Sequence, residues 1–143
     1  MRGLQVVKGV FLSALIACLL GACDEEGQPY KDGALLYEKH CENCHMEDGS
    51  GLEALYPPLA SSDMLKSMDV AAACIIRNGL QGPVTVNGVQ YDMEMPPMPQ
   101  LSGVEIANLL NYIHNAWENE RDYISLDKVQ ATLERCRAGV PEK

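Results

Sequence analysis

Two cysteines and one histidine lie close together in this chain: two residues separate Cys41 from Cys44, and His45 follows directly. In the pattern C-x-x-C-H, both sulfurs form thioethers with the vinyl groups of a porphyrin. The histidine after the second cysteine then reaches the iron from one side of the ring. The pattern therefore predicts one covalent haem c, attached through Cys41 and Cys44 and ligated by His45.

Two other kinds of site also use closely spaced cysteines. A redox-active dithiol expects a preceding strand and a thioredoxin-like alternation of elements, and neither is visible around Cys41. A structural zinc site needs four ligands, and the next candidate after His45 lies far along the chain. Haem attachment is therefore favoured over both alternatives.

The second axial position of the iron needs a ligand from elsewhere in the chain. A proline-rich loop offers three methionine sulfurs within six residues, and a thioether opposite a histidine raises the reduction potential of haem iron. Pro96 and Pro97 stiffen this loop, so less disorder is gained when a weak Fe–S bond breaks. We expect Met95 to be the ligand, with Met98 as the alternative and Met93 as the third choice, because methionines more often fill cores.

The first 22 residues have the features of an export signal. A short positive region precedes an apolar run from Val10 to Leu20, which is too short to span a membrane. The sequence Leu20-Gly21-Ala22-Cys23 resembles the bacterial lipoprotein cleavage box, which implies a lipid on Cys23. The alternative is an ordinary cleaved signal with a coincidental cysteine. We expect an exported protein, anchored by lipid at the periplasmic face of a membrane.

The charge of the exported chain limits its partners. Removing residues 1–22 removes two of eleven basic residues and none of twenty acidic residues, which leaves a net charge of −11. This surface argues against nucleic acid and against electrostatic attachment to anionic lipid. It favours a basic patch on a protein partner.

Helices are predicted on both sides of the haem motif. A helical pattern begins at Gly33, with Asp32 as its N-cap, and delivers Cys41. A second helix is predicted over residues 69–78, ended by a glycine. After this second helix and before Ser102, valines flank Asn87-Gly88, which is a hairpin signal.

The strongest helical pattern follows a capping box at Ser102. Its apolar positions are Ile106, Leu109, Leu110, Ile113 and Trp117. Asn111 and His114 lie on its polar flank, where we expect His114 to be solvated. A last helix is predicted to start at Ser125, so the fold class is all-α.

In this order, the motifs resemble those of class I cytochromes c, the small monohaem electron carriers of bacteria and mitochondria. The resemblance covers about Gly33 to Trp117. It implies three to five helices around one covalent haem, with the first and last helices crossing, so that Leu36 or Tyr37 meets the helix after Ser102. Two departures are the lipoprotein box and the additional C-terminal helix.

The resemblance also implies roles for individual residues. The methionine of the Met-Pro-Pro element is the distal ligand in that family, which corresponds to Met95. A proline carbonyl accepts the Nδ1 hydrogen of the proximal histidine, and Pro57 is the matching position. The expected organisation is a lipoprotein signal peptide at 1–22, a tether at 23–31, a cytochrome c domain at 32–120 and a helical extension at 121–143.

Two cysteines remain after those assigned to the signal, the lipid and the haem. Cys74 and Cys136 make an even remainder in an exported protein, which suggests one disulfide. It would join the extension to the middle helix. The alternative is two separately buried thiols.

These features predict a protein that transfers electrons and is not an enzyme, because filled axial positions leave no site for a substrate. The expected donors are a quinol-oxidising complex or a periplasmic dehydrogenase, and the expected acceptors are a terminal oxidase or reductase of a respiratory chain. One alternative is a haem subunit permanently docked to a periplasmic oxidoreductase. A less favoured one is a haem peroxidase or gas sensor with an open distal site.

Overall fold

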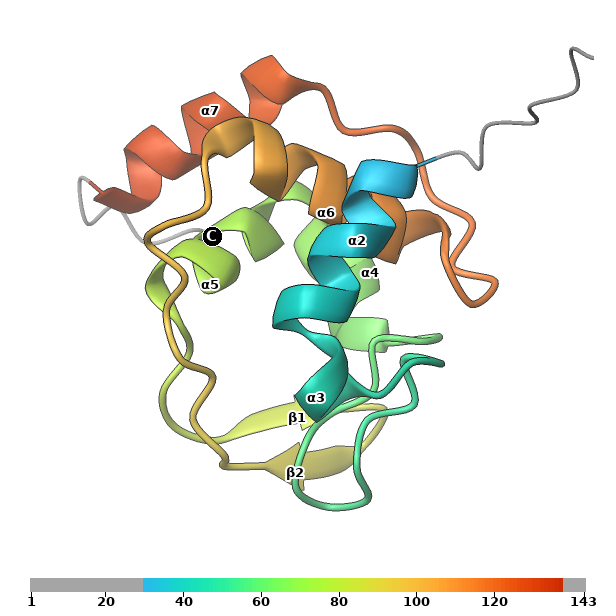
Figure 1. Ribbon diagram of the computed structural model, residues 1–143. Helices are drawn as coiled ribbons and strands as arrows, with labels where there is room; N and C mark the ends of the chain where they lie inside the picture. The colour runs from blue at the N-terminus through green and yellow to red at the C-terminus, as the bar shows by residue number, and fades with distance from the viewer. Residues whose placement is uncertain (1–29, 138–143) are drawn as a thin grey trace, which may run out of the picture.

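The structure, a computed structural model, describes residues 30–137 of the chain. The predicted export signal, Cys23 and most of the tether lie outside the described residues. The elements in chain order are α2 (Lys31–His40), α3 (Glu42–His45), α4 (Asp63–Met68), η1 (Asp69–Ala71), α5 (Ala72–Asn78), β1 (Val84–Val86), β2 (Val89–Tyr91), α6 (Gly103–Asn115) and α7 (Leu126–Arg137) (Figure 1). The predicted all-α class is confirmed, with one small hairpin. None of the helices formed within residues 30–137 is long and apolar enough to cross a membrane.

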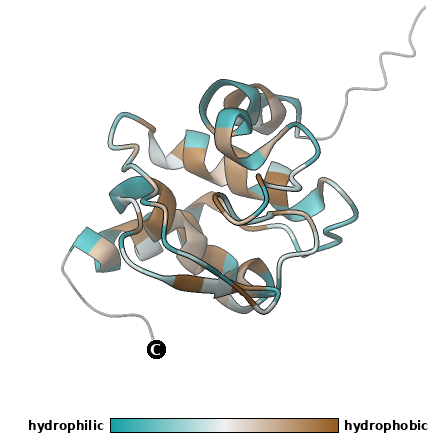
Figure 2. Ribbon diagram, turned by 90° about the horizontal axis from the view of Figure 1, so that it is seen from below, coloured by the Kyte–Doolittle hydropathy of each residue, from teal (hydrophilic) through white to brown (hydrophobic). Residues whose placement is uncertain are grey.

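The crossing of α2 and α6 forms the centre of the fold, as predicted from the resemblance. The ring of Tyr37 lies 5.5 Å from that of Tyr112 and is only 2% exposed. At Gly33, a Cβ atom would collide with the carbonyl oxygen of Asn108, so a glycine allows the two backbones to approach. Apolar segments gather at the middle of the molecule and hydrophilic segments at its periphery (Figure 2).

The helix boundaries differ from the prediction at two places. α2 begins at Lys31, with Tyr30 as its N-cap, so Asp32 lies in the first turn and does not cap it. The predicted helix over 69–78 begins as the 3₁₀ turn η1 before continuing as α5. Both differences are local, and the helices still deliver the haem motif and the methionine loop.

The capping box at Ser102 is confirmed, but α6 is shorter than its apolar pattern suggested. The helix ends at Asn115, and Trp117 lies beyond it with a positive φ of 50°. Its indole ring packs 4.9 Å from the ring of Tyr37, and its Nε1 donates to the carbonyl of Glu47 at 3.0 Å. Trp117 therefore belongs to the core through a loop contact, not through the helix face.

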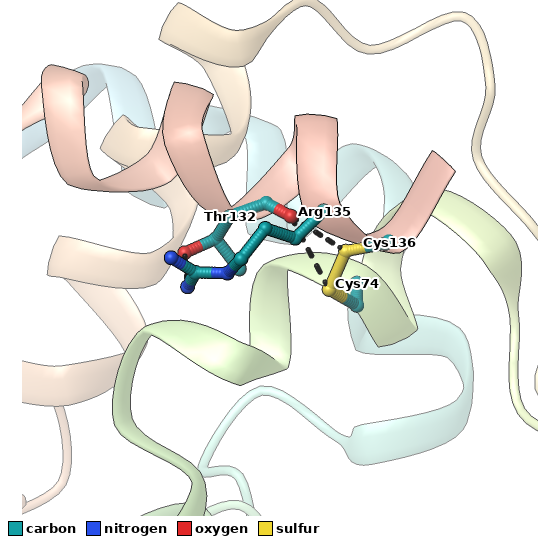
Figure 3. Close-up of a disulfide and its surroundings, with 4 residues drawn as sticks. All are labelled: Cys74, Thr132, Arg135 and Cys136. Carbon is teal, nitrogen blue, oxygen red and sulfur yellow. Dashed lines mark hydrogen bonds between the residues drawn. A yellow bond between two sulfur atoms is a disulfide. The ribbon is translucent and has the colours of Figure 1, made fainter. Parts of the chain in front are cut away.

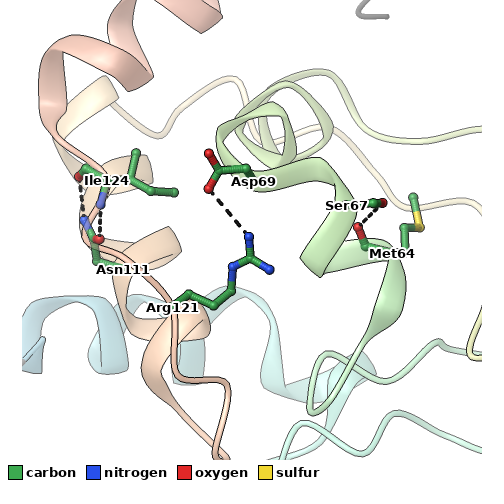
Figure 4. A network of polar contacts seen from close by, with 6 residues as sticks. All are labelled: Met64, Ser67, Asp69, Asn111, Arg121 and Ile124. Atoms are coloured by element: carbon green, nitrogen blue, oxygen red, sulfur yellow. Dashed lines mark hydrogen bonds and ion pairs between the residues drawn. The ribbon is translucent and has the colours of Figure 1, made fainter.

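The polar flank of α6 is buried, which contradicts the expectation for His114. The side chains of Asn111 and His114 are 2% and 0% exposed. Asn111 donates to the carbonyl of Ile124 and accepts from its N–H, so the stretch after α6 folds back over this flank (Figure 4). In the same linker, Arg121 forms a salt bridge of 3.7 Å with Asp69.

The C-terminal helix α7 packs against the cytochrome core. Val129 and Thr132 are fully buried in its interface with α5 and α6. A disulfide joins Cys74 on α5 to Cys136 on α7, with 5.8 Å between their Cα atoms (Figure 3). The extension is therefore an integral part of the described fold.

Candidate haem site

One helical turn presents the histidine of the C-x-x-C-H motif. α3 follows Cys41 directly, and the N–H of His45 donates to the carbonyl of Cys41 at 2.9 Å. The Nδ1 of His45 lies 2.9 Å from the carbonyl oxygen of Pro57, so Nδ1 carries the hydrogen and donates it. This is the contact that the resemblance implied for Pro57.

The protonation state of His45 suits a metal ligand. Burial lowers the pKa of the imidazole below its ordinary value, and the hydrogen bond to Pro57 opposes this shift only in part. The ring is therefore neutral at pH 7. Within residues 30–137 no hydrogen bond reaches Nε2, so its lone pair is available to a metal.

The two cysteines of the motif are free thiols beside the histidine. Cys41 is buried at 6% exposure and Cys44 is half-buried. Cys41 lies in the wall of the same cavity as His45. Cys44 follows three residues later in the same turn, so the two thiols can form two thioethers with a flat macrocycle inside the cavity.

The cavity itself is lined almost entirely by apolar side chains. Its walls come from the segment after α3, from α4 and α5, from the hairpin and from α6. Representative wall residues are Pro58, Leu65, Ile76, Val86, Leu110 and Ile113. The donor set of two thiols, one imidazole and one thioether fits a covalent haem, and the apolar walls fit its macrocycle.

The structure separates the three candidate methionines. Met95 lines the cavity with His45. Met98 is 9% exposed and packed in the core, and its N–H donates to the carbonyl of Ile76 at 3.0 Å. Met93 is 50% exposed. Of these three methionines, only Met95 lines the cavity.

The backbone of Met95 is held by residues that the sequence analysis did not assign to the site. Leu80 and Met95 form a bridge of two backbone hydrogen bonds, each 3.0 Å long. Gly79, predicted only as a helix end, has φ +76°, and a Cβ atom there would lie 2.5 Å from the carbonyl oxygen of Met95. Arg77 also donates to the carbonyl of Pro99 at 2.9 Å. No sequence signal distinguished these roles, because each depends on the loop returning to the end of α5.

Comparisons with known proteins agree with this geometry. A family model described as cytochrome c matches residues 30–117. Cytochrome c-552 of Thermus thermophilus is 37% identical over 90 residues, which cover 60% of this chain and 68% of that protein. The cytochrome c subunit of a quinone alcohol dehydrogenase from Gluconobacter oxydans is 33% identical over 89 residues. That alignment covers 61% of this chain but only 18% of the subunit, so the likeness is limited to one domain.

The matched residues contain the C-x-x-C-H motif, the cavity and the methionine loop. Proteins of this family bind one covalent haem c and transfer electrons through it. The chain therefore belongs to the cytochrome c family, as a class I c-type cytochrome that carries one haem c.

Proposed function

We propose that this protein is a one-electron carrier whose haem is attached through Cys41 and Cys44 and ligated by His45 and Met95. One observation carries the assignment: the imidazole of His45, oriented by Pro57, and the side chain of Met95 both line one apolar cavity. When bound, the haem supplies a reversible one-electron couple.

The residues of the chain determine how easily that couple is reduced. The carbonyl of Pro57 accepts the Nδ1 hydrogen of His45, which fixes the ring and makes Nε2 a stronger donor. The thioether of Met95 favours ferrous iron, and the apolar walls disfavour the additional charge of ferric iron. The last two effects raise the reduction potential, so we expect a relatively high-potential carrier.

The distal ligand is tested by replacing Met95 and a matched methionine. We expect Met95→Ala to abolish the long-wavelength Fe–S absorption of the oxidised protein, to lower the potential and to let the reduced protein bind carbon monoxide. Met98→Ala removes a buried thioether from the same loop and should leave the Fe–S absorption in place. If Met95→Ala retains that absorption and Met98→Ala loses it, the ligand is Met98.

We further propose that the carrier is an exported lipoprotein anchored through Cys23. The described fold begins at Tyr30, seven residues after Cys23, and an extended chain of this length spans at most about 25 Å. A tether of this reach would keep the domain near the membrane while allowing it to turn. We expect Cys23→Ala to release the haem protein from the membrane fraction, and retention there would refute the anchor.

The proposed partners are a quinol-oxidising complex or dehydrogenase as donor and a terminal oxidase or reductase as acceptor. The likeness to a subunit of a quinone alcohol dehydrogenase supports a second candidate, a haem subunit docked to an oxidoreductase. The buried face of α7, with Val129 and Thr132, is already used within the domain, which favours the carrier. The molar mass of the purified holoprotein separates the two, because a carrier is expected to be a monomer.

A further inference from the structure

Charge is unevenly distributed over the described residues, and the imbalance follows the haem pocket. The stretches 41–65 and 78–100, which contain His45 and Met95, hold seven carboxylates and no lysine or arginine. The remainder of residues 30–137 holds nine carboxylates and eight lysines or arginines. Nearly all of the net negative charge of the described chain therefore lies on two of the stretches that line the pocket, whereas the other lining residues, on α4, α5 and α6, belong to the nearly neutral remainder.

Parts of these stretches lie together at one end of the molecule. The hairpin β1–β2 and the loop after α3 are gathered there, and α7, with three of the cationic residues, lies at the other end (Figure 1). Six of the seven carboxylates are exposed, and we call them the acidic collar. The acidic collar consists of Glu47, Asp48, Glu53, Asp63, Asp92 and Glu94.

Exposed apolar side chains accompany the acidic collar. On the loop after α3, Leu52 is 40% exposed and Leu55 is 50% exposed. On the hairpin and the methionine loop, Val89 is 46% exposed and Met93 is 50% exposed. Apolar contacts within a charged rim are typical of transient protein interfaces, and redox encounters are among the smallest of these.

We propose that the acidic collar and these four apolar side chains form the docking surface for a redox protein whose own electron-transfer site is surrounded by lysines and arginines. The inference rests on the proposed function and adds the chemistry of the partner. Complementary charge accelerates encounter and turns the two proteins so that their redox centres face each other. A partner with an acidic surface would be repelled from the same end.

Small redox complexes of opposite charge test the steering directly. The reduced holoprotein donates one electron either to the cation tris(phenanthroline)cobalt(III) or to the anion ferricyanide, and stopped-flow absorption gives both rate constants. The collar variant Glu47→Gln/Glu53→Gln/Asp92→Asn avoids Asp48, Asp63 and Glu94, whose side chains accept hydrogen bonds. The control variant removes the same charge from the linker and α7, as Glu120→Gln/Asp127→Asn/Glu134→Gln.

At about 0.01 M ionic strength, we expect the collar variant to react about three- to tenfold more slowly with the cobalt cation and faster with ferricyanide. The control variant should change each rate less than about twofold. At about 1 M the differences should disappear, because the screening length falls from about 30 Å to about 3 Å. Equal changes in the two variants would overturn the inference.

Polylysine serves as a probe of basic protein surface in a second measurement. Its addition to the reduced holoprotein should shift the amide resonances of the collar residues and leave those of α7 unchanged. Shifts centred on α7 would also overturn the inference. Failure of the proposed function is distinguishable, since the protein would then exchange electrons with neither complex.

Discussion

The substitution Gly79→Ala tests how the fold holds Met95 in place. Gly79 has φ +76° and ψ −179°, a region of backbone conformation that is essentially restricted to glycine. Its hydrogen atoms face the methionine loop, because an added Cβ would lie 2.5 Å from the carbonyl oxygen of Met95 and 2.9 Å from the nitrogen of Pro97. An alanine there must either distort α5 or push the loop away from the pocket.

The expected loss of stability follows from these two contacts. Holding a residue other than glycine in this conformation costs about 1–3 kcal/mol. Displacing the loop also breaks the two hydrogen bonds between Leu80 and Met95, which contribute about 1 kcal/mol each. We therefore expect Gly79→Ala to lower the free energy of unfolding by about 3–5 kcal/mol. We also expect it to weaken or abolish the Fe–S absorption of the oxidised holoprotein.

Gly82→Ala provides the matched control. Gly82 has a similar φ of +83°, but an added Cβ would meet nothing within 4 Å. Its substitution should cost about 1–2 kcal/mol of conformational strain and leave the Fe–S absorption unchanged. Guanidinium unfolding and absorption spectra of both oxidised holoproteins give the comparison. If the two variants are equally stable and both keep the Fe–S absorption, contact with Gly79 does not position Met95.

Three further substitutions test other parts of the structure. Burial lowers the pKa of the His114 imidazole to about 4, and the nearby guanidinium of Arg121 adds to this shift. The folded protein therefore resists protonation of His114 more than the unfolded chain does. The stability that the neutral ring contributes is complete above the unfolded pKa of about 6.5 and is lost as the pH falls from there to about 4. The loss is at most about 3 kcal/mol, and His114→Leu should remove this part of the pH dependence of unfolding. Cys74→Ser removes the disulfide to Cys136, which joins residues 62 positions apart and constrains the unfolded chain. We expect guanidinium unfolding to show a loss of about 4 kcal/mol in the free energy of unfolding. Equal stability of the reduced and the oxidised wild-type protein would contradict this. Gly33→Ala should lower the midpoint of thermal unfolding by several degrees, about 4–8 °C per kcal/mol, because the new methyl group meets the backbone of α6; an unchanged midpoint would show that the crossing can relax.

Local chemistry was predictable from the order of residues alone. The C-x-x-C-H motif, the capping box at Ser102 and the hairpin at Asn87-Gly88 each depend on neighbours within a few positions. In the hairpin, Asn87 and Gly88 both have positive φ, as the turn between its two strands requires. Such signals located most helices and predict the attachment residues of the haem.

The burial of the polar flank of α6 was not predictable from the pattern of that helix. Helical periodicity assigns a face to solvent by assuming that nothing else in the chain covers it. Here the linker after α6 covers Asn111 and His114, and Asn111 satisfies the N–H and carbonyl of Ile124. Trp117 was assigned to the helix face because its spacing fits the apolar pattern, but the helix ends at Asn115 and Trp117 reaches Tyr37 from a loop.

The distal half of the haem site depends on tertiary structure in the same way. Sequence order favoured Met95 over Met98 and Met93 because of its prolines, but it contained nothing about which of these residues would line the cavity with His45. That choice depends on the loop returning to the end of α5, where Gly79 leaves room for it and Leu80 pairs with it. Residues adjacent in the chain are constrained by covalent geometry, whereas residues brought together from distant segments are placed only by the packing of the whole fold.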